Sequence, residues 1–516
     1  MSLIAKINIL KSALFLSALF LVSLQSYSQD DIELLPGSDF YEFDENTGYG
    51  RLIGNVHFLY LGNDMYCDSA HYFKNQKAVR AYGHVQINKN DTLNLFCDSL
   101  YYNGRTGKAK LWGNVRVRDN EFKLTTDTLD YDTKKGQAHY HYGGRVESIL
   151  TQEVLTSRVG YFHPNSKNFF FSKNVVYDRQ DLHMETDTLQ YVYSQKKVFF
   201  FGPTDIVAND AAMYCEEGWY NTDTREGSLQ RNAWISKEKD YISGDTLMYN
   251  PNEGYSIGLG NVYYKDSTQN MEFNGDYAYS SDTLNYSFLT GNAYATKYLQ
   301  DDTMYVFADT LFMEQLDSND VMKAFHNAKI FSTKVQCVAD SITFDGLQEL
   351  IFLNKEPIVW AKIAELKGEL ITIHLSDTMI HQVNILDKAS IVMEVQTDSL
   401  YNQIAGKKIV ANFKDNDLYQ ANVTGNAVTI FYPEEEIKTD STFIKKRQGM
   451  NRLYASDLRI DIDSSEISGI TYLDKPDGAF YPMDQIKKDE MFIKDFSWKE
   501  ALRPKRDLVV EGEGED

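Results

Sequence analysis

Aspartate residues recur along the chain in one local pattern, Asp-Ser/Thr-Leu-x-Tyr. The clear copies begin at Asp98, Asp127, Asp187 and Asp245, and weaker copies begin at Asp68, Asp276, Asp309, Asp340 and Asp398. Carboxylates can serve as acid–base catalysts or as calcium ligands. Acid–base catalysis would need one pair of carboxylates that differs from the other copies, and these aspartates all have the same context. Calcium binding of the β-roll type would need the spacing Gly-Gly-x-Gly-x-Asp, which the chain lacks. We interpret these aspartates as corner residues that satisfy backbone N–H groups where a strand bends.

Two acidic groups depart from this pattern. Glu216-Glu217 replaces a corner aspartate, and Glu434-Glu435-Glu436 follows Pro433 in what we expect to be a loop. Glycoside cleavage would need one unusual carboxylate pair. We interpret both groups as solvated surface, so an enzyme that acts on polysaccharide is the disfavoured hypothesis.

Other types of active site are also weakly indicated. His139 and His141 flank Tyr140, so both would face one side of a strand, but no nearby Cys or third His completes a metal site. The chain contains no Gly-rich phosphate loop, no Gly-x-Ser-x-Gly motif and no Cys/His pair of catalytic type. We expect no enzymatic activity, no metal and no cofactor.

The four cysteines stand at related positions. Cys67, Cys97 and Cys215 each precede the corner acidic residue, and Cys337 stands three before Asp340. These offsets place them on the face that carries the apolar residues, where we expect small, buried, reduced thiols. Equivalent strands of neighbouring repeats would hold Cys67 and Cys97 ~9–10 Å apart at Cα, too far for a disulfide.

A second marker runs out of phase with the aspartates and reveals a repeat. It is a Gly-Asn-Val-like tripeptide, with copies at Gly54-Asn55-Val56, Gly83-His84-Val85, Gly113-Asn114-Val115, Gly144-Arg145-Val146, Asn174-Val175, Asn232-Ala233, Gly260-Asn261-Val262, Gly291-Asn292-Ala293, Asn327-Ala328 and Gly425-Asn426-Ala427. The copies recur about every 30 residues, a period typical of repeat arrays. Two markers in constant phase predict one structural unit per repeat.

Between the markers, apolar residues alternate with polar ones, which predicts half-buried strands and not helices. Each repeat is therefore predicted to be an antiparallel hairpin whose long strands bend at the Gly-Asn and the Asp markers. Bending every strand produces two facing sheets, a bent two-sheet trough with an all-β fold. The candidate residues of its inner, lipid-binding face are Val85, Ile87, Leu95, Val115, Val117 and Leu124.

The composition and the N-terminal segment limit the classes of protein to which this chain can belong. The chain has 516 residues, 35 Tyr and 29 Phe but 9 Pro, and a formal net charge of −22. This charge argues against nucleic acid as a partner. Lys6 and Lys11 precede the apolar stretch 13–24, and Ser26-Tyr27-Ser28 places small residues before Gln29, as in an export signal. We expect cleavage after residue 28, with an uncleaved anchor as the alternative.

The repeated units resemble the OstA-like β-jellyroll domain shared by the LptA, LptC and LptD proteins of lipopolysaccharide transport. The resemblance covers roughly Arg51 to Pro433. It is nearest to the long OstA-like proteins of the Bacteroidetes lineage, including the ending Phe496-Ser497-Trp498 … Leu502-Arg503-Pro504-Lys505. It implies a trough whose inner face carries lipid A acyl chains and whose repeats join edge to edge into a bridge. The greater length of this chain leaves self-association open.

These observations predict an export signal over residues 1–28 and a lead-in over 29–50. OstA-like repeats are expected over 51–345, more divergent repeats over 346–475, and a partly helical C-terminal cap with an acidic tail over 476–516. The resemblance implies a periplasmic bridge that carries lipopolysaccharide toward the outer membrane, with LptC-type and LptD-type proteins as partners. The alternative is a structural or adhesive β-repeat with a closed core and no lipid ligand.

Overall fold

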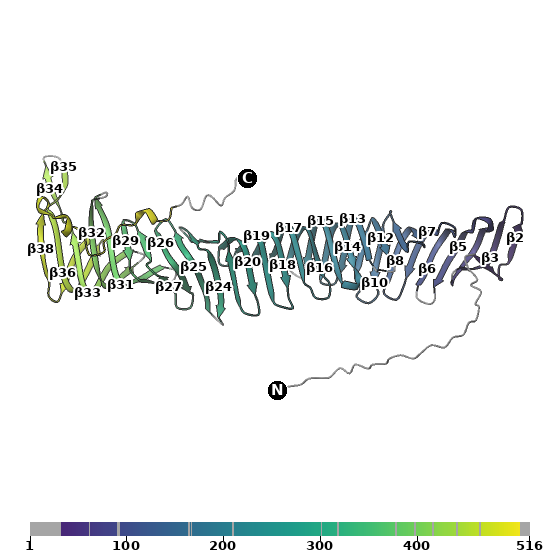
Figure 1. Cartoon of the computed structure of the whole chain (residues 1–516), viewed down its shortest axis with the longest axis horizontal. Helices are drawn as coiled ribbons and strands as arrows, with labels where there is room; N and C mark the ends of the chain where they lie inside the picture. The colour runs from purple at the N-terminus through teal and green to yellow at the C-terminus, as the bar shows by residue number, and fades with distance from the viewer. Residues whose placement is uncertain are drawn as a thin grey trace, which may run out of the picture. The chain divides into compact units, whose positions relative to one another are not determined.

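The computed structural model describes residues 32–505, apart from 61, 90–92, 164, 165, 167, 209, 210, 301, 317, 318, 377, 378, 397, 398, 415, 416, 440, 441, 464 and 465. The expected export signal and the acidic tail from Glu511 lie outside this part. The chain divides into two compact units, residues 1–138 and 139–516. The described residues form strands and short 3-10 helices (Figure 1).

Unit 1 consists of antiparallel hairpins. Its strands are β1 (Glu33–Leu35), β2 (Phe40–Asp44), β3 (Tyr49–Tyr60), β4 (Asn63–Phe73), β5 (Ala78–Lys89), β6 (Leu93–Asn103), β7 (Lys108–Arg118) and β8 (Phe122–Asp132), with the 3-10 helix η1 (Lys74–Gln76) between β4 and β5. From β3 to β8 each strand pairs with the next. The division between the units falls within β9 (Gln137–Tyr140).

Unit 2 continues the same hairpin pattern with more variation. Its strands in the first half are β10 (Gly144–Ser148), β11 (Val154–Ser157), β12 (Val159–His163), β13 (Asn168–Arg179), β14 (Leu182–Val192), β15 (Lys197–Ala208), β16 (Ala211–Asn221), β17 (Gly227–Lys237), β18 (Asp240–Asn250), β19 (Tyr255–Asp266), β20 (Met271–Ser281), β21 (Tyr286–Thr290), β22 (Tyr294–Tyr298), β23 (Thr303–Phe307) and β24 (Thr310–Leu316). The 3-10 helix η2 (Tyr193–Gln195) follows β14.

The second half of unit 2 contains the longest of the described strands and a separate two-stranded hairpin, β34 with β35. Its strands are β25 (Asn319–Phe331), β26 (Val335–Asp345), β27 (Leu350–Asn354), β28 (Ile358–Ala361), β29 (Ala364–Lys367), β30 (Leu370–Ser376), β31 (Met379–Gln396), β32 (Leu400–Lys414), β33 (Asp417–Phe431), β34 (Glu434–Thr439), β35 (Thr442–Arg447), β36 (Gly449–Asp463), β37 (Glu466–Leu473) and β38 (Asp477–Pro482). The 3-10 helices η3 (Met483–Gln485), η4 (Lys488–Glu490) and η5 (Glu500–Leu502) follow.

Strands bend at most copies of the Gly-Asn marker, as predicted, whereas neither Gly144 nor Arg145 has a positive φ. Two successive residues there adopt positive φ, as at Gly54-Asn55, Gly83-His84, Gly113-Asn114, Arg231-Asn232, Gly260-Asn261, Gly291-Asn292 and Gly425-Asn426. The pairing register shifts at the same points, for example between Ile53 and Val56. Glycine populates positive φ without a Cβ penalty, and asparagine tolerates it better than most residues. The marker therefore encodes a crease that crosses the strands.

The recurrent aspartates are corner residues, but they act differently from the expectation. Asn114 Nδ2 donates to Asp98 Oδ2 at 2.8 Å, and Asn292 Nδ2 donates to Asp276 Oδ2 at 3.0 Å. The carboxylate thus accepts from the Asn side chain of the next strand. Room for it comes from the glycine, since a Cβ on Gly113 would lie 2.3 Å from Asp98 Oδ2. The aspartate of one marker therefore contacts both residues of the Gly-Asn marker on the neighbouring strand.

The crease separates two sheets in each unit. We call the strand segments that carry the Leu of Asp-Ser/Thr-Leu sheet A, and those that carry the Val of Gly-Asn-Val sheet B. Residues from both sheets share one core: in unit 1 the rings of Phe58 (sheet B) and Tyr72 (sheet A) lie 5.7 Å apart. In unit 2 one buried cluster combines Val262 and Cys337 of sheet B with Leu289 and Ile342 of sheet A. The predicted all-β jellyroll of bent hairpin repeats is confirmed.

One local expectation was wrong. Glu434-Glu435-Glu436 lies in strand β34 and not in a loop, because it pairs in register with β35. Glu434 Oε1 lies 3.0 Å from Arg447 Nη2 of that strand. The segment after Pro482 contains the short 3-10 helices η3, η4 and η5. It packs against buried residues of the sheet, among them Met450 and Ile430.

Candidate functional site

A row of apolar side chains crosses the inner face of sheet B in unit 1. The residues paired in register are Phe58, Met65, Ile87, Leu95, Val117 and Leu124. The row exists because alternate residues of each strand point to one face, and because every hairpin keeps the same register relative to its crease. Four of the six residues proposed from the sequence, Ile87, Leu95, Val117 and Leu124, lie in this row.

The six proposed residues differ in depth. Val85 and Val115 lie one step nearer the crease and are 0% exposed, and Leu124 is 9% exposed. Ile87, Leu95 and Val117 are only partly buried. An apolar ligand could reach these three without displacing the core. The alternation of apolar and polar residues in the sequence placed all six residues on one face. It did not indicate which of them are fully buried and which are partly exposed.

Unit 2 has a corresponding row on the inner face of its sheet B. It comprises Met184, Ile206, Met213, Ile235, Ile242, Tyr264, Phe273 and Ala295, paired in register. Met213, Ile235, Ile242 and Tyr264 are again partly buried, whereas Met184 is 1% exposed. Each unit thus has an apolar row of varying depth, which we call its inner row.

The interior of unit 1 presents almost no polar group to a ligand. Among its described buried side chains, Thr126 is the polar exception. Sheet A contributes tyrosines: the Tyr72 hydroxyl donates to the Ile32 carbonyl, and burial raises the pKa of Tyr102 and of Tyr131. These phenols stay neutral at physiological pH. The inner row is therefore suited to hydrocarbon chains and not to charged ligands.

The residues that first suggested acid–base or metal chemistry serve other contacts. Glu216 accepts a hydrogen bond from Asn232 at a crease, 2.9 Å away. The rings of His139 and His141 pack on each other and on Tyr161. In the described part of the chain, no group of three or more His, Cys, Asp or Glu side chains is placed to hold a metal ion.

The four cysteines are buried and free, and burial raises the pKa of each thiol to about 12. Strand β5 lies between Cys67 in β4 and Cys97 in β6. We expect all four thiols to be unreactive in the folded protein and alkylated after denaturation without reductant, because thiolates are the reactive species. Mass spectrometry checks this. A Cys67–Cys97 disulfide would contradict the hairpin register.

A family of known proteins matches the part of the chain that contains all six proposed lipid-binding residues. Residues 39–187 match the family model of OstA-like proteins. This part of the chain is OstA-like. The resemblance found in the repeats is confirmed over these residues. The match begins before Arg51 at Asp39, whose Oδ1 accepts a hydrogen bond from Asn55 Nδ2 at 3.2 Å.

Similar solved structures include LptH of Pseudomonas aeruginosa, described as the LptA homologous periplasmic component of the conserved lipopolysaccharide transport device. The identity is 10%, the alignment covers 28% of this chain and 80% of that chain, and the TM-score is 0.15. A search of curated proteins returned no match. Within the residues that the structure describes, no helix is long and apolar enough to cross a membrane.

Proposed function

We propose that this protein is a periplasmic carrier of lipopolysaccharide, holding lipid A acyl chains against the inner rows on the way to the outer membrane. The observation that carries the proposal is the inner row of an OstA-like segment, apolar in every member and partly exposed at Ile87, Leu95 and Val117. Acyl chains gain about 0.8 kcal/mol for each CH₂ removed from water. The partly exposed side chains of the inner row lie in register on neighbouring strands, so an acyl chain that lies along the row can be buried against them.

Transport by this route requires neighbours that deliver and receive lipid. We propose LptC-type and LptD-type proteins with OstA-like domains as these partners, and export by the signal over residues 1–28 as the way into the periplasm. The proposal includes no enzymatic step, no metal and no cofactor. Lipid would move because successive positions offer similar apolar contacts.

A closed structural repeat is the second candidate function. The full burial of Val85 and Val115 and the large mixed cluster of unit 2 favour it, since both are typical of a dry core. The two candidates differ in what contacts the partly exposed residues of the row: lipid in the first, and only protein or water in the second.

Photo-crosslinking in living cells distinguishes the candidates. A photoreactive amino acid at Leu95 or Val117 is expected to label lipopolysaccharide, whereas the same group at Arg116 is not, because Arg116 is exposed and points to the opposite face of the strand. Crosslinked species are detected by immunoblotting for lipopolysaccharide. Equal labelling at Val117 and Arg116, or labelling of protein alone at both Leu95 and Val117, would refute the carrier.

A further inference from the structure

The outer face of sheet B in unit 2 carries a row that no inner-face function explains. Its residues, paired in register across successive strands, are Gln336, Trp360, Glu365, Val392, Gln403, Ile430 and Arg452. An outer face ordinarily meets water. Here Trp360, Glu365 and Gln403 are 0% exposed and Gln336 is 4% exposed. Something covers these polar groups and satisfies them.

The cover is the segment 486–505, which we call the strap. It runs across the strands, and its main chain is bound by side chains of the row. Gln403 uses both ends of its amide: Nε2 donates to the Met491 carbonyl at 2.8 Å, and Oε1 accepts from the Ile493 N–H at 2.9 Å. Arg452 Nη1 donates to the carbonyls of Glu490 and Phe492. These contacts are made to the main chain of a bent segment, since Glu490 ends η4 and Met491 has αR backbone angles.

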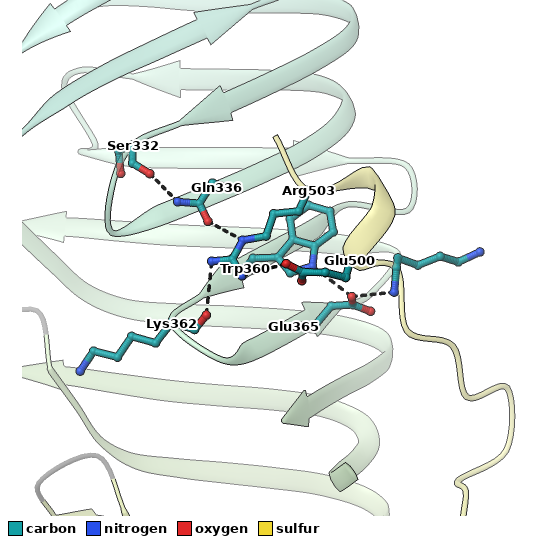
Figure 2. Close-up of polar contacts among 8 residues, drawn as sticks. Ser332, Gln336, Trp360, Lys362, Glu365, Glu500 and Arg503 are labelled. Atoms are coloured by element: carbon teal, nitrogen blue, oxygen red, sulfur yellow. Dashed lines mark hydrogen bonds and ion pairs between the residues drawn. The ribbon is translucent and has the colours of Figure 1, made fainter. Parts of the chain in front are cut away.

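A buried carboxylate provides the next contact along the strap. Glu365 Oε2 accepts from Trp360 Nε1 at 3.0 Å and from the Lys499 N–H at 2.8 Å. Lys367 Nζ lies 2.7 Å from Glu365 Oε1 and also donates to the carbonyl and hydroxyl of Ser497. Glu365 and Lys367 therefore each form hydrogen bonds to the strap in addition to their ion pair. Figure 2 shows Trp360 and Glu365 beneath the strap.

The end of the strap is held by a side chain of its own. Arg503 Nε donates to Gln336 Oε1 at 2.7 Å, and Arg503 Nη2 donates to the Lys362 carbonyl at 3.3 Å (Figure 2). Glu500 Oε1 lies 3.3 Å from Arg503 Nη1. A planar guanidinium bound at both edges fixes direction as well as position.

Aromatic contacts supply the apolar part of the interface. The ring of Tyr401 lies 5.2 Å from that of Phe496 and 5.4 Å from that of Trp498. Ile493, 8% exposed, joins Leu400, Ile430 and Met450 in a separate buried cluster. The strap is thus held through its main chain at 490–493 and at 497 and 499, through the aromatic rings of Phe496 and Trp498, and through Arg503 at its end. This combination is typical of peptide recognition.

We propose that this outer face is a peptide-binding face whose resident ligand is the strap. It accepts in trans a peptide that adopts the bent conformation of the strap, with aromatic residues at the positions of Phe496 and Trp498 and an arginine at that of Arg503. Most polar contacts of the row reach main-chain groups of the strap, which another peptide presents when it adopts the same conformation. The resident strap competes through its covalent attachment, so exchange becomes visible when its own anchors are weakened.

The test uses the full chain and a fluorescent synthetic peptide of residues 486–505, followed by anisotropy. A Trp498→Ala, Arg503→Ala chain keeps the face intact and is expected to bind the peptide at least about tenfold more tightly than the unaltered chain, whose strap competes. Adding Gln403→Ala and Arg452→Ala to that chain is expected to abolish the gain. A peptide with Phe496, Trp498 and Arg503 replaced by alanine serves as the inactive control.

Hydrogen exchange of the Ile493 amide reports whether the weakened strap has left the face. Exchange at that amide without peptide binding would overturn the proposal, because the face would then be vacant and still not recognise its ligand. If the double variant fails to fold, Arg503→Ala alone releases the end of the strap while the aromatic anchors remain. Equal peptide affinity for this variant and for the unaltered chain would then count against exchange.

Discussion

Val115→Asp and Val117→Asp are expected to have opposite consequences, although the two residues lie on the same strand and the same face. Val115 is 0% exposed, so an aspartate there buries an unpaired charge at a cost of several kcal/mol. A domain has only about 5–15 kcal/mol of stability. We therefore expect Val115→Asp to unfold unit 1. Val117 is partly exposed, and an aspartate there can keep contact with water.

The carrier function predicts that Val117→Asp folds and yet fails. A charge in the inner row would oppose acyl chains at each passage, so cells that depend on this variant should become permeable to large apolar antibiotics. Circular dichroism and protein abundance in the periplasmic fraction verify folding. Val117→Thr, with nearly the same shape and no charge, is the matched control. A folded, abundant Val117→Asp variant with an intact envelope would contradict the carrier.

Much of the fold follows from local sequence signals. The Gly-Asn marker predicts a bend because few other residues adopt positive φ in succession, and the structure places creases there. The aspartates could be assigned to corners because their contexts repeat. Their partner could not be predicted: the hydrogen bond between Asp98 and Asn114 joins neighbouring strands, so it depends on a register that a single strand does not encode.

Other features depend on tertiary contacts and left no local signal. Val115 and Val117 are equivalent in the alternation, but their exposure depends on their distance from the crease and on the opposite sheet. Gln403 and Arg452 look like ordinary outward polar residues of β-strands. Only the strap, which is remote in sequence, converts them into a buried row.

Glu365→Ala is expected to destabilise the second half of unit 2 by about 3–5 kcal/mol, the usual effect of breaking a buried ion pair. The substitution removes the acceptor of Trp360 Nε1 and of the Lys499 N–H, and it leaves the Lys367 ammonium without its partner. Trp360 and Lys367 lie under the strap, and Lys499 belongs to it. We expect the loss to appear as faster hydrogen exchange in β28, in β29 and in the strap amides, and as a lower melting temperature.

Two further variants determine which interaction matters. Glu365→Gln retains an oxygen acceptor but loses the charge, so its destabilisation should lie between those of the alanine variant and the unaltered chain. Glu369→Ala breaks an ion pair with Lys388 whose side chains are 51% and 75% exposed, and it should cost less than about 1 kcal/mol. If Glu365→Ala proves as mild as Glu369→Ala, the buried carboxylate does not hold the strap. Hydrogen exchange confined to β28 and β29, with the strap amides still protected, would instead locate its role within the sheet.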